Sequence, residues 1–276
     1  MQPPAPSGDP SAPSAPSSPS RPLAARRHGE ILRRLSAAGS VGVGEVAAFF
    51  GVSHETIRRD LKQLAARGQL DIVHGGAARR EANEPALDKR ESENAEGKAA
   101  IGRFAATLVE DGMVVLLDSG TTTLAVARSL PAKRNLTICT GSLAIAQLLC
   151  RVPGSRVHLL GGEVDPNDEA TTGIDMLDAV ARFRVDVAFL GGGGLAPDGE
   201  ITDYTRAGAE LRGRMIRGAA CAYFVMDHAK FGRLTPVRIP NFSAAAGLIV
   251  DAAPPLPTRA ALAAHGLRLM VTGNGK

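Results

Sequence analysis

The stretch that decides the fold at the start of this chain is GVSHETIRRDLKQL, residues 51–64. Ser53 can cap a helix, because its side-chain oxygen can accept a backbone N–H that the first turn leaves unpaired. Apolar residues then recur at positions 57, 61 and 64, a spacing that predicts one buried helix face. The opposite face is charged and carries His54, Glu55, Arg58, Arg59 and Lys62. The stretch is therefore predicted to be an amphipathic helix with a basic outer face.

The flanking segments complete a recognisable motif. Residues 43–50 predict a short apolar helix, and Gly51 can adopt the positive φ of a tight turn. Two helices joined by such a turn form a helix-turn-helix, whose second helix enters the DNA major groove. A strand at residues 70–73 and a turn at 74–76 extend the motif to a winged helix. Composition alone leaves an alternative open, a helical hairpin with a solvated charged face.

Residues 26–77 resemble the DNA-binding domain of the DeoR/GlpR family of bacterial transcription regulators, through VS-x-x-TIRRDL-x-x-L and the closing HGGA. The family usually has Ser or Thr where this chain has Gly42, and Gly is a tolerated helix cap. The resemblance implies double-stranded operator DNA as a partner. The expected DNA-binding residues are Ser53, His54, Glu55, Thr56, Arg58, Arg59, Lys62 and His74.

Composition and charge agree with this expectation. The 276 residues carry a net charge of +4, and residues 1–80 alone hold 11 Lys or Arg against 6 Asp or Glu. A basic module on a near-neutral remainder is typical of phosphate-backbone binding. No apolar run approaches the roughly 20 residues that span a bilayer, and no secretory signal is visible, so a cytoplasmic protein without membrane contact is expected. The three cysteines lack CxxC spacing, and we expect no metal and no cofactor.

The pattern divides the chain into four parts. Residues 1–22 are rich in Pro and Ser and predict a disordered tail, with a proline-rich docking segment as the alternative. Residues 23–78 are the predicted winged helix-turn-helix, and the polar residues 79–97 are the predicted linker. From residue 98 to 276, short apolar strands alternate with helices. This alternation predicts an α/β fold with a doubly wound, mainly parallel sheet.

A polar turn follows the first predicted strand of this second domain. The turn reads Asp118, Ser119, Gly120, Thr121, Thr122 and Thr123, and it opens directly into a helix. Backbone N–H groups, a helix N-terminus and three hydroxyls would together form a site for an anion such as phosphate. The turn is neither a Walker A loop nor GxGxxG. The alternative is an ordinary well-capped helix start.

Other polar or glycine-rich turns follow the later strands. In a doubly wound sheet such turns meet at one edge, where small molecules bind. The candidate effector residues from these turns and the nearby helix starts are Thr140, Gly141, Gly161, Gly162, Gly191, Gly192, Asp203, Glu210, Asp227 and Lys230. Asp203 and Glu210 could equally be solvated helix-start charges.

The same segments are similar to the effector domain of the DeoR/GlpR family, with DSGTTTLAVA, LLGGE, DVAFLGGGGL and MDHAKFGR as the shared motifs. The resemblance implies a sensor domain that resembles ribose-phosphate isomerase and binds a phosphorylated sugar or related metabolite. It also matches Arg90 and Lys98 to family positions. The family commonly has Thr-Asn where this chain has Thr140-Gly141, which puts the identity of the effector in doubt.

Two functions from different classes are compatible with these patterns. One is a transcriptional regulator, a repressor released from operator DNA by a phosphorylated sugar, acting as a dimer or tetramer because symmetric half-sites need symmetric proteins. The other is a sugar-phosphate isomerase with an added DNA-binding domain. Isomerisation needs a general base and acid near the substrate. Leu190 precedes the glycine run and the isomerase family's acidic segment is missing, so we expect the regulator and no enzymatic activity.

Overall fold

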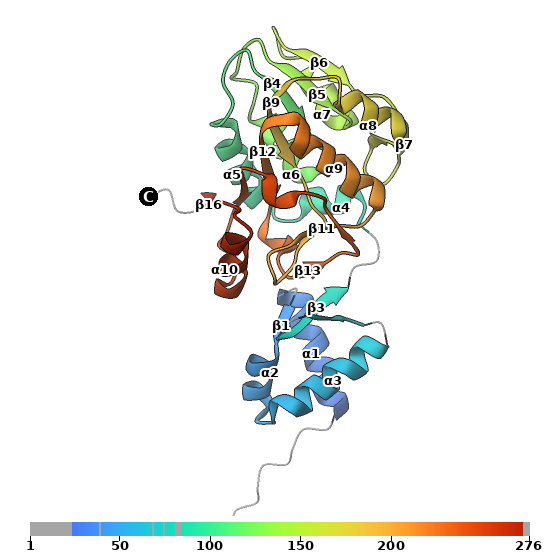
Figure 1. Cartoon of the computed structure of the whole chain (residues 1–276), viewed down its shortest axis with the longest axis vertical. Coiled ribbons are helices and arrows are strands. Elements are labelled where there is room, and N and C mark those ends of the chain that lie inside the picture. The colour runs from blue at the N-terminus through green and yellow to red at the C-terminus, as the bar shows by residue number, and fades with distance from the viewer. Residues whose placement is uncertain (1–23, 39, 68, 74, 81–83, 273–276) are drawn as a thin grey trace, which may run out of the picture.

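The computed structural model of the chain describes residues 24–272 apart from residues 39, 68, 74 and 81–83, and it shows a smaller and a larger domain joined end to end (Figure 1). The expected tail at 1–22 and the predicted DNA contact His74 lie outside the described residues. Among the helices that are described, none has the length and apolar character needed to cross a membrane.

The smaller domain is a winged helix, as predicted. Its elements are α1 (Ala24–Ala38), β1 (Ser40–Gly42), α2 (Val43–Phe50), α3 (His54–Ala66), β2 (Asp71–Val73) and β3 (Gly76–Arg80). The apolar face of α3 is buried at Ile57, Leu61 and Leu64, as the spacing predicted. Gly51 has φ 61° at the turn between α2 and α3, and the Ser53 side chain accepts the N–H of Thr56 at 3.2 Å.

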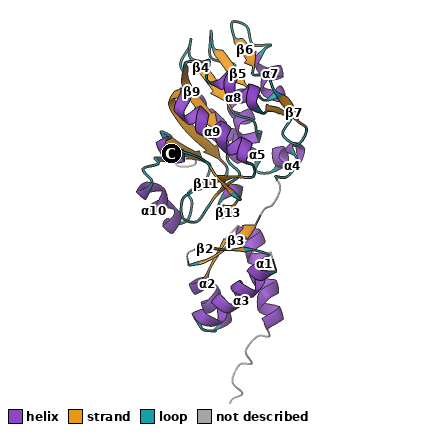
Figure 2. Ribbon diagram, turned by 45° about the vertical axis from the view of Figure 1, so that its right-hand side comes forward, coloured by secondary structure: helices purple, strands orange, loops and turns teal. Residues whose placement is uncertain are grey.

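The larger domain is built on a seven-stranded parallel sheet, which confirms the predicted doubly wound fold (Figure 2). In spatial order its strands are β16 (Leu269–Val271), β15 (Gly247–Val250), β12 (Ala219–Met226), β9 (Val185–Leu190), β4 (Val114–Leu117), β5 (Thr137–Thr140) and β6 (Arg156–Leu159). All neighbouring strands are parallel.

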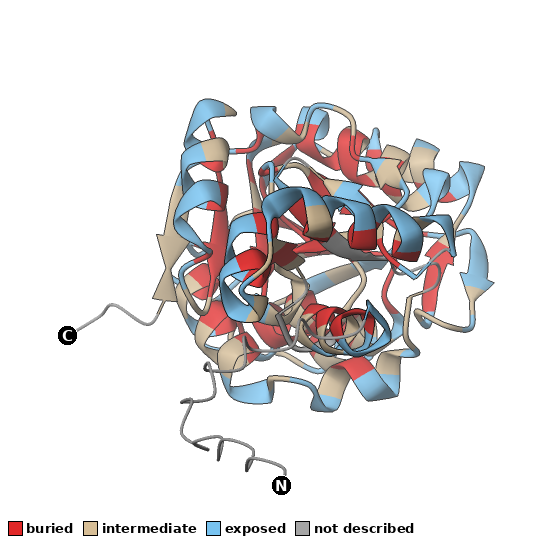
Figure 3. Cartoon of the chain, turned by 90° about the horizontal axis from the view of Figure 1, so that it is seen from below, coloured by how far each residue is buried: buried red, intermediate tan, exposed pale blue. Residues whose placement is uncertain are grey.

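Helices cover both faces of this sheet. The core on one face includes residues of α5 (Ala95–Ala106), α6 (Thr121–Arg128) and α7 (Leu143–Leu149). The core on the other includes residues of α8 (Ile174–Val180), α9 (Arg206–Gly218) and α10 (Leu256–Ala264). Buried segments lie on the inner sides of the helices and exposed ones on their outer sides (Figure 3).

The strand order reverses at the centre of the sheet. The chain starts at β4 and moves outward through β5 and β6, then returns to β9 on the other side of β4 and continues to β12, β15 and β16. Ligands of open α/β sheets bind outside the carboxyl ends of the strands at such a reversal. This places the expected binding site beyond Leu117 of β4 and Leu190 of β9.

Several short elements were not predicted from the sequence. They are α4 (Leu87–Ser92), β7 (Glu163–Asp165), β8 (Ala170–Thr172), β10 (Gly194–Leu195), β11 (Ile201–Asp203), β13 (Arg233–Leu234), β14 (Val237–Arg238), η1 (His228–Lys230) and η2 (Phe242–Ala244). Strands of two or three residues are too short to show a hydrophobic period. The predicted linker at 79–97 contains secondary structure, namely α4 and the start of α5.

Strand β3 belongs to both domains. Its first residues, 76–78, pair antiparallel with β1 and β2 inside the wing. Its last two, Arg79 and Arg80, pair parallel with Arg233 and Leu234 of β13 in the larger domain. Both strands lie where the two domains meet (Figure 1). The wing is thus joined to the larger domain by backbone pairing as well as by the chain itself.

Candidate DNA interface and effector site

The outer face of α3 presents the predicted basic surface. His54, Glu55, Arg58, Arg59 and Lys62 are exposed, and Thr56 is half-buried. The closest ion pair on this face joins Arg58 to Glu55 at 3.6 Å, and both side chains are largely solvated. Because an exposed pair of this kind contributes little to stability, these residues are free to rearrange on a nucleic acid.

One residue of the TIRRD segment has a structural role instead. Asp60 is buried on the inner side of α3, where it pairs with Arg27 of α1 at 2.7 Å and lies 3.2 Å from Nε2 of His28. A buried carboxylate is tolerated only when it is paired and hydrogen-bonded. This cluster fixes α1 against α3 and so sets the orientation of the basic face.

In the larger domain, Asp118 connects the strand ends at the centre of the sheet. Its Oδ1 accepts the N–H of Ser119 at 2.8 Å, and its Oδ2 accepts the N–H of Gly191 at 2.9 Å. Arg212 of α9 pairs with Asp118 at 2.8 Å and also with Asp203. Burial lowers the pKa of the Arg212 guanidinium, but the surrounding carboxylates, led by Asp118 and Asp203, raise it above the usual value. Asp118 and Asp203 are therefore bound to protein groups and form the frame of the site.

The N-terminus of α6 opens beside this frame. Its first N–H groups have no partner within the helix, and Gly120 provides no side-chain cap. The hydroxyl of Thr123 donates back to the carbonyl of Gly120 at 2.9 Å. Among the described residues, the hydroxyls of Thr121 and Thr122 show no such bond. The hydroxyls of Thr121 and Thr122, two of the three predicted donors, are thus available to bind an anion.

Lys230 supplies a buried positive charge at the same place. Its side chain is only 14% exposed, and Nζ has no hydrogen-bond partner in the described part of the chain. Its Nζ forms an ion pair with Oε1 of Glu84 at 3.5 Å. Burial lowers the pKa of Lys230, and Glu84 opposes that shift. A buried ammonium group that makes an ion pair but no hydrogen bond is incompletely satisfied, and an anionic ligand could supply the missing hydrogen bonds.

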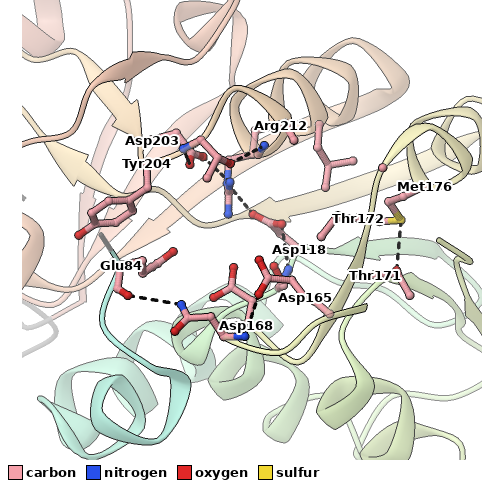
Figure 4. A pocket seen from close by; sticks show the side chains of 18 of the residues that line it. Glu84, Asp118, Asp165, Asp168, Thr171, Thr172, Met176, Asp203, Tyr204 and Arg212 are labelled. Atoms are coloured by element: carbon pink, nitrogen blue, oxygen red, sulfur yellow. Dashed lines mark hydrogen bonds and ion pairs between the residues drawn. The ribbon is translucent and has the colours of Figure 1, made fainter. Parts of the chain in front are cut away.

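A larger cavity of about 510 Å³ adjoins this point and shares Glu84, Ser119, Asp168 and Arg212 with it. In Figure 4, Glu84 and Tyr204 stand on one side of the cavity and Thr171, Thr172 and Met176 on the other. Five of its six charged lining residues are acidic, among them Asp165 at the end of β7 and Asp168 of the β7–β8 loop. Carboxylates accept hydrogen bonds from hydroxyl groups, so the cavity is suited to a polyhydroxylated molecule.

Comparisons with known proteins assign the chain to a family. Residues 27–83 match the model of the DeoR-like helix-turn-helix domain, and residues 93–252 match that of the DeoR C terminal sensor domain. The chain belongs to the DeoR family. It is 32% identical to the glycerol-3-phosphate regulon repressor of Escherichia coli K12, over 88% of this chain and 97% of the relative. It is 30% identical to the HTH-type transcriptional repressor CsqR of the same organism, over 86% and 91%.

A solved structure of D-ribose-5-phosphate isomerase in complex with phospho-erythronic acid also matches, over 50% of this DeoR-family chain and 55% of that chain, at 17% identity and TM-score 0.36. A likeness at this level carries no argument about the site. Family membership itself makes the chain a DNA-binding transcriptional regulator, in keeping with its winged helix and basic recognition helix.

The structure of this DeoR-family regulator brings most predicted effector residues together. Those that line the two adjoining cavities are Asp118, Ser119, Gly120, Thr121, Thr122, Thr123, Gly191, Gly192, Asp203, Asp227 and Lys230. Glu210 lines neither and instead pairs with Arg214 at 3.2 Å and with Arg217 at 3.5 Å. As the sequence analysis allowed, it is a helix-surface charge.

Thr140, Gly141, Gly161 and Gly162 also line neither cavity. A Cβ atom on Gly141 would lie 2.7 Å from Oγ1 of Thr171 and 3.0 Å from Cε of Met176. These two side chains, which line the larger cavity, take the space beside the position where the family commonly has Asn. Gly141 thus lies against two side chains that form part of the wall of the larger cavity.

Sequence reasoning missed Glu84, Arg90, Asp165, Asp168 and Arg212. Arg90 and Lys98 match family positions, but the sequence offered no reason to place them in the site. Arg90 is buried and bonds Glu84 at 2.8 Å and Asp168, and Lys98 donates to the carbonyls of Arg90 and Glu93. One signal in the sequence could have revealed Arg212, since it is a lone Arg on an otherwise apolar helix face.

Proposed function

We propose that this regulator represses genes of carbohydrate or related metabolism and is released from double-stranded operator DNA by a phosphorylated sugar or similar metabolite. The observation that carries the proposal is Lys230, whose buried ammonium lacks a hydrogen-bond partner among the described residues and faces the uncapped start of α6. A phosphate group would satisfy both at once. The acidic cavity next to it would take the hydroxyls of the sugar.

Two related proposals follow from DNA binding. Operator half-sites related by a two-fold axis require two recognition helices, so we propose that the protein acts as a dimer or tetramer. Because its target is chromosomal DNA, we propose that it acts in the cytoplasm. Relatives that are named repressors of the glycerol-3-phosphate regulon and of the aga operon support a sugar-derived effector.

Ligand binding is tested by thermal unfolding of the whole chain. A ligand that binds only the folded state stabilises it by about 2.7 kcal/mol at a hundred times its Kd. We expect phosphorylated sugars or polyol phosphates to raise the melting temperature, while the matching unphosphorylated compounds do not. Lys230→Met should abolish the rise. A panel in which no phosphorylated compound raises the melting temperature would contradict the proposal.

We infer that the chain is not an isomerase. Asp118, which accepts the N–H of Gly191, and Asp203 are both held by Arg212, and Leu190 stands just before Gly191. A proton-transfer step needs a group within reach of the substrate carbons and free to titrate. We expect no interconversion of ribose 5-phosphate and ribulose 5-phosphate above background. Turnover that co-purifies with the chain and disappears on mutating Asp227 would overturn this inference.

A further inference from the structure

Glu84 lines the space at the start of α6 where the phosphate is proposed to bind. The cavity between Lys230, Thr121 and Thr122 is small, with a volume of about 30 Å³. A phosphate that binds Lys230 there competes with the carboxylate of Glu84 for the same ammonium group. The other groups at this point belong mainly to packed strands and helices of the sensor domain, whereas Glu84 comes from the segment that follows the wing.

Glu84 already occupies the position of an anionic ligand. Its Oε1 lies 3.5 Å from Nζ of Lys230 and accepts a hydrogen bond from Nη1 of Arg90 at 2.8 Å. Burial raises the pKa of Glu84, and the charges of Lys230 and Arg90 oppose that rise. A carboxylate held between two buried cations has the chemistry of the phosphate that the site is proposed to bind.

The same segment carries the connection to the DNA-binding domain. Glu84 stands four residues after Arg80, the last residue of wing strand β3. The Leu87 N–H donates to the carbonyl of Asn167 at 3.2 Å, which ties the segment to the loop that lines the larger cavity. A ligand that enters the two cavities therefore contacts the anchor points of this segment.

Strand β13, the partner of β3, is attached to the site from the other side. It follows η1, which carries Lys230, and it packs against the glycine run that starts in the site. A Cβ atom on Gly194 would lie 2.3 Å from the carbonyl oxygen of Arg233, and the Gly232 N–H donates to the carbonyl of Leu195 at 2.8 Å. Lys230 thus lies shortly before β13 in the sequence, and Glu84 lies shortly after β3.

We propose that Glu84 is the switching residue of the effector site, an internal substitute for the effector's phosphate. In the effector-free protein its carboxylate pairs with Lys230 and Arg90 and holds residues 84–87 against the sensor domain. The phosphate takes its place on Lys230, Glu84 leaves, and the β3–β13 pair loosens. This deepens the proposed function and rests on it, because it assumes that an anion binds beside Lys230. By linkage, whatever weakens the Glu84 contacts must strengthen anion binding.

Inorganic phosphate and hydrogen–deuterium exchange test the proposal without knowledge of the operator or the effector. Glu84→Gln removes the competing charge and keeps the shape of the side chain. Glu91→Gln is the matched control, because it removes the same charge from the same segment, where Glu91 pairs with exposed Arg128. Phosphate affinity is measured by calorimetric titration, and exchange is followed in peptides that cover β3 and β13.

We expect Glu84→Gln to bind phosphate roughly 5- to 150-fold more tightly than the wild type, the usual range of coupling between two linked events. Its β3 amides should exchange faster without phosphate, whereas wild type and Glu91→Gln should reach that faster exchange only with phosphate. Equal phosphate affinity and equal exchange in all three proteins would overturn the switching role and leave the anion site intact. If phosphate bound to none of them, the proposed anion site would itself be wrong.

Discussion

The carboxylate of Asp118 accepts the N–H of Gly191 at 2.9 Å and so ties the carboxyl end of β4 to that of β9. Arg212 pairs with the same oxygen at 2.8 Å from α9. Three elements that are distant in the sequence therefore meet at one buried carboxylate, at the point where the strand order of the sheet reverses. The geometry of the candidate effector site therefore depends on this contact.

Asp118→Ala should destabilise the sensor domain strongly. It leaves the Arg212 guanidinium with one carboxylate instead of two and removes the acceptor of two backbone N–H groups, and breaking a buried pair costs about 3–5 kcal/mol. Urea unfolding measures the loss. Glu210→Gln is the control, because Glu210 and its partners are partly exposed and such surface pairs contribute about 1 kcal/mol or less. Equal stability of the two variants would show that Asp118 is not part of the frame.

Thr121→Val combined with Thr122→Val should weaken binding of a phosphorylated effector without unfolding the protein. Each lost hydrogen bond to a charged group costs about 1.5–3 kcal/mol, so affinity should fall by roughly a hundredfold or more. Operator binding without effector should stay unchanged, and the variant should remain in its effector-free state. Calorimetry and operator binding on one preparation give both values.

Thr123→Val separates this role from helix capping. Its hydroxyl bonds the carbonyl of Gly120, so this variant should lower the melting temperature and keep effector affinity within a few-fold. Normal effector response in the Thr121 and Thr122 double variant would end the assignment of the loop to phosphate binding.

Arg58→Ala combined with Arg59→Ala should weaken operator binding and leave the fold intact. Both side chains are exposed on α3, and each lost base or phosphate contact costs about 1–3 kcal/mol. The dependence of affinity on salt should also decrease, because fewer counterions are released. An operator sequence is first selected from random DNA. Footprinting on that sequence at several salt concentrations then measures the affinity and its dependence on salt. The control, Arg134→Ala with Arg151→Ala, removes the same charge from the sensor domain, and an equal effect of both double variants would exclude a direct contact.

Gly141→Ala should destabilise the protein by about 1–3 kcal/mol, the usual cost of overpacking. The added Cβ would press on Thr171 and Met176, whose positions shape the larger cavity. Gly161→Ala is the control, because a Cβ there meets nothing within 4 Å. If Gly141→Ala were as stable as Gly161→Ala, the wall of the cavity would be more adaptable than its packing indicates.

The sequence by itself determined the elements whose patterns are local. The buried face of α3, the Ser53 cap and the turn at Gly51 follow from spacing and residue type within one helical turn. The alternation of short apolar strands and helices after residue 98 could be predicted as well, because an uninterrupted apolar run of strand or helix length shows in the sequence itself. The polar turn at residues 118–123 could also be recognised in the sequence, because all its residues are consecutive.

Which distant groups share the candidate effector site follows from tertiary packing and could not be predicted from the sequence. Arg212 meets Asp118 across 94 positions of sequence, and Glu84 reaches Lys230 across 146, separations at which no periodicity carries information. Glu210 and Gly141 show the converse. Both were predicted to contact the effector, but Glu210 pairs with Arg214 and Gly141 lies against Thr171 and Met176. Local patterns set helices and strands through backbone geometry, whereas the pairing of buried charges depends on the sheet order that brings their elements together.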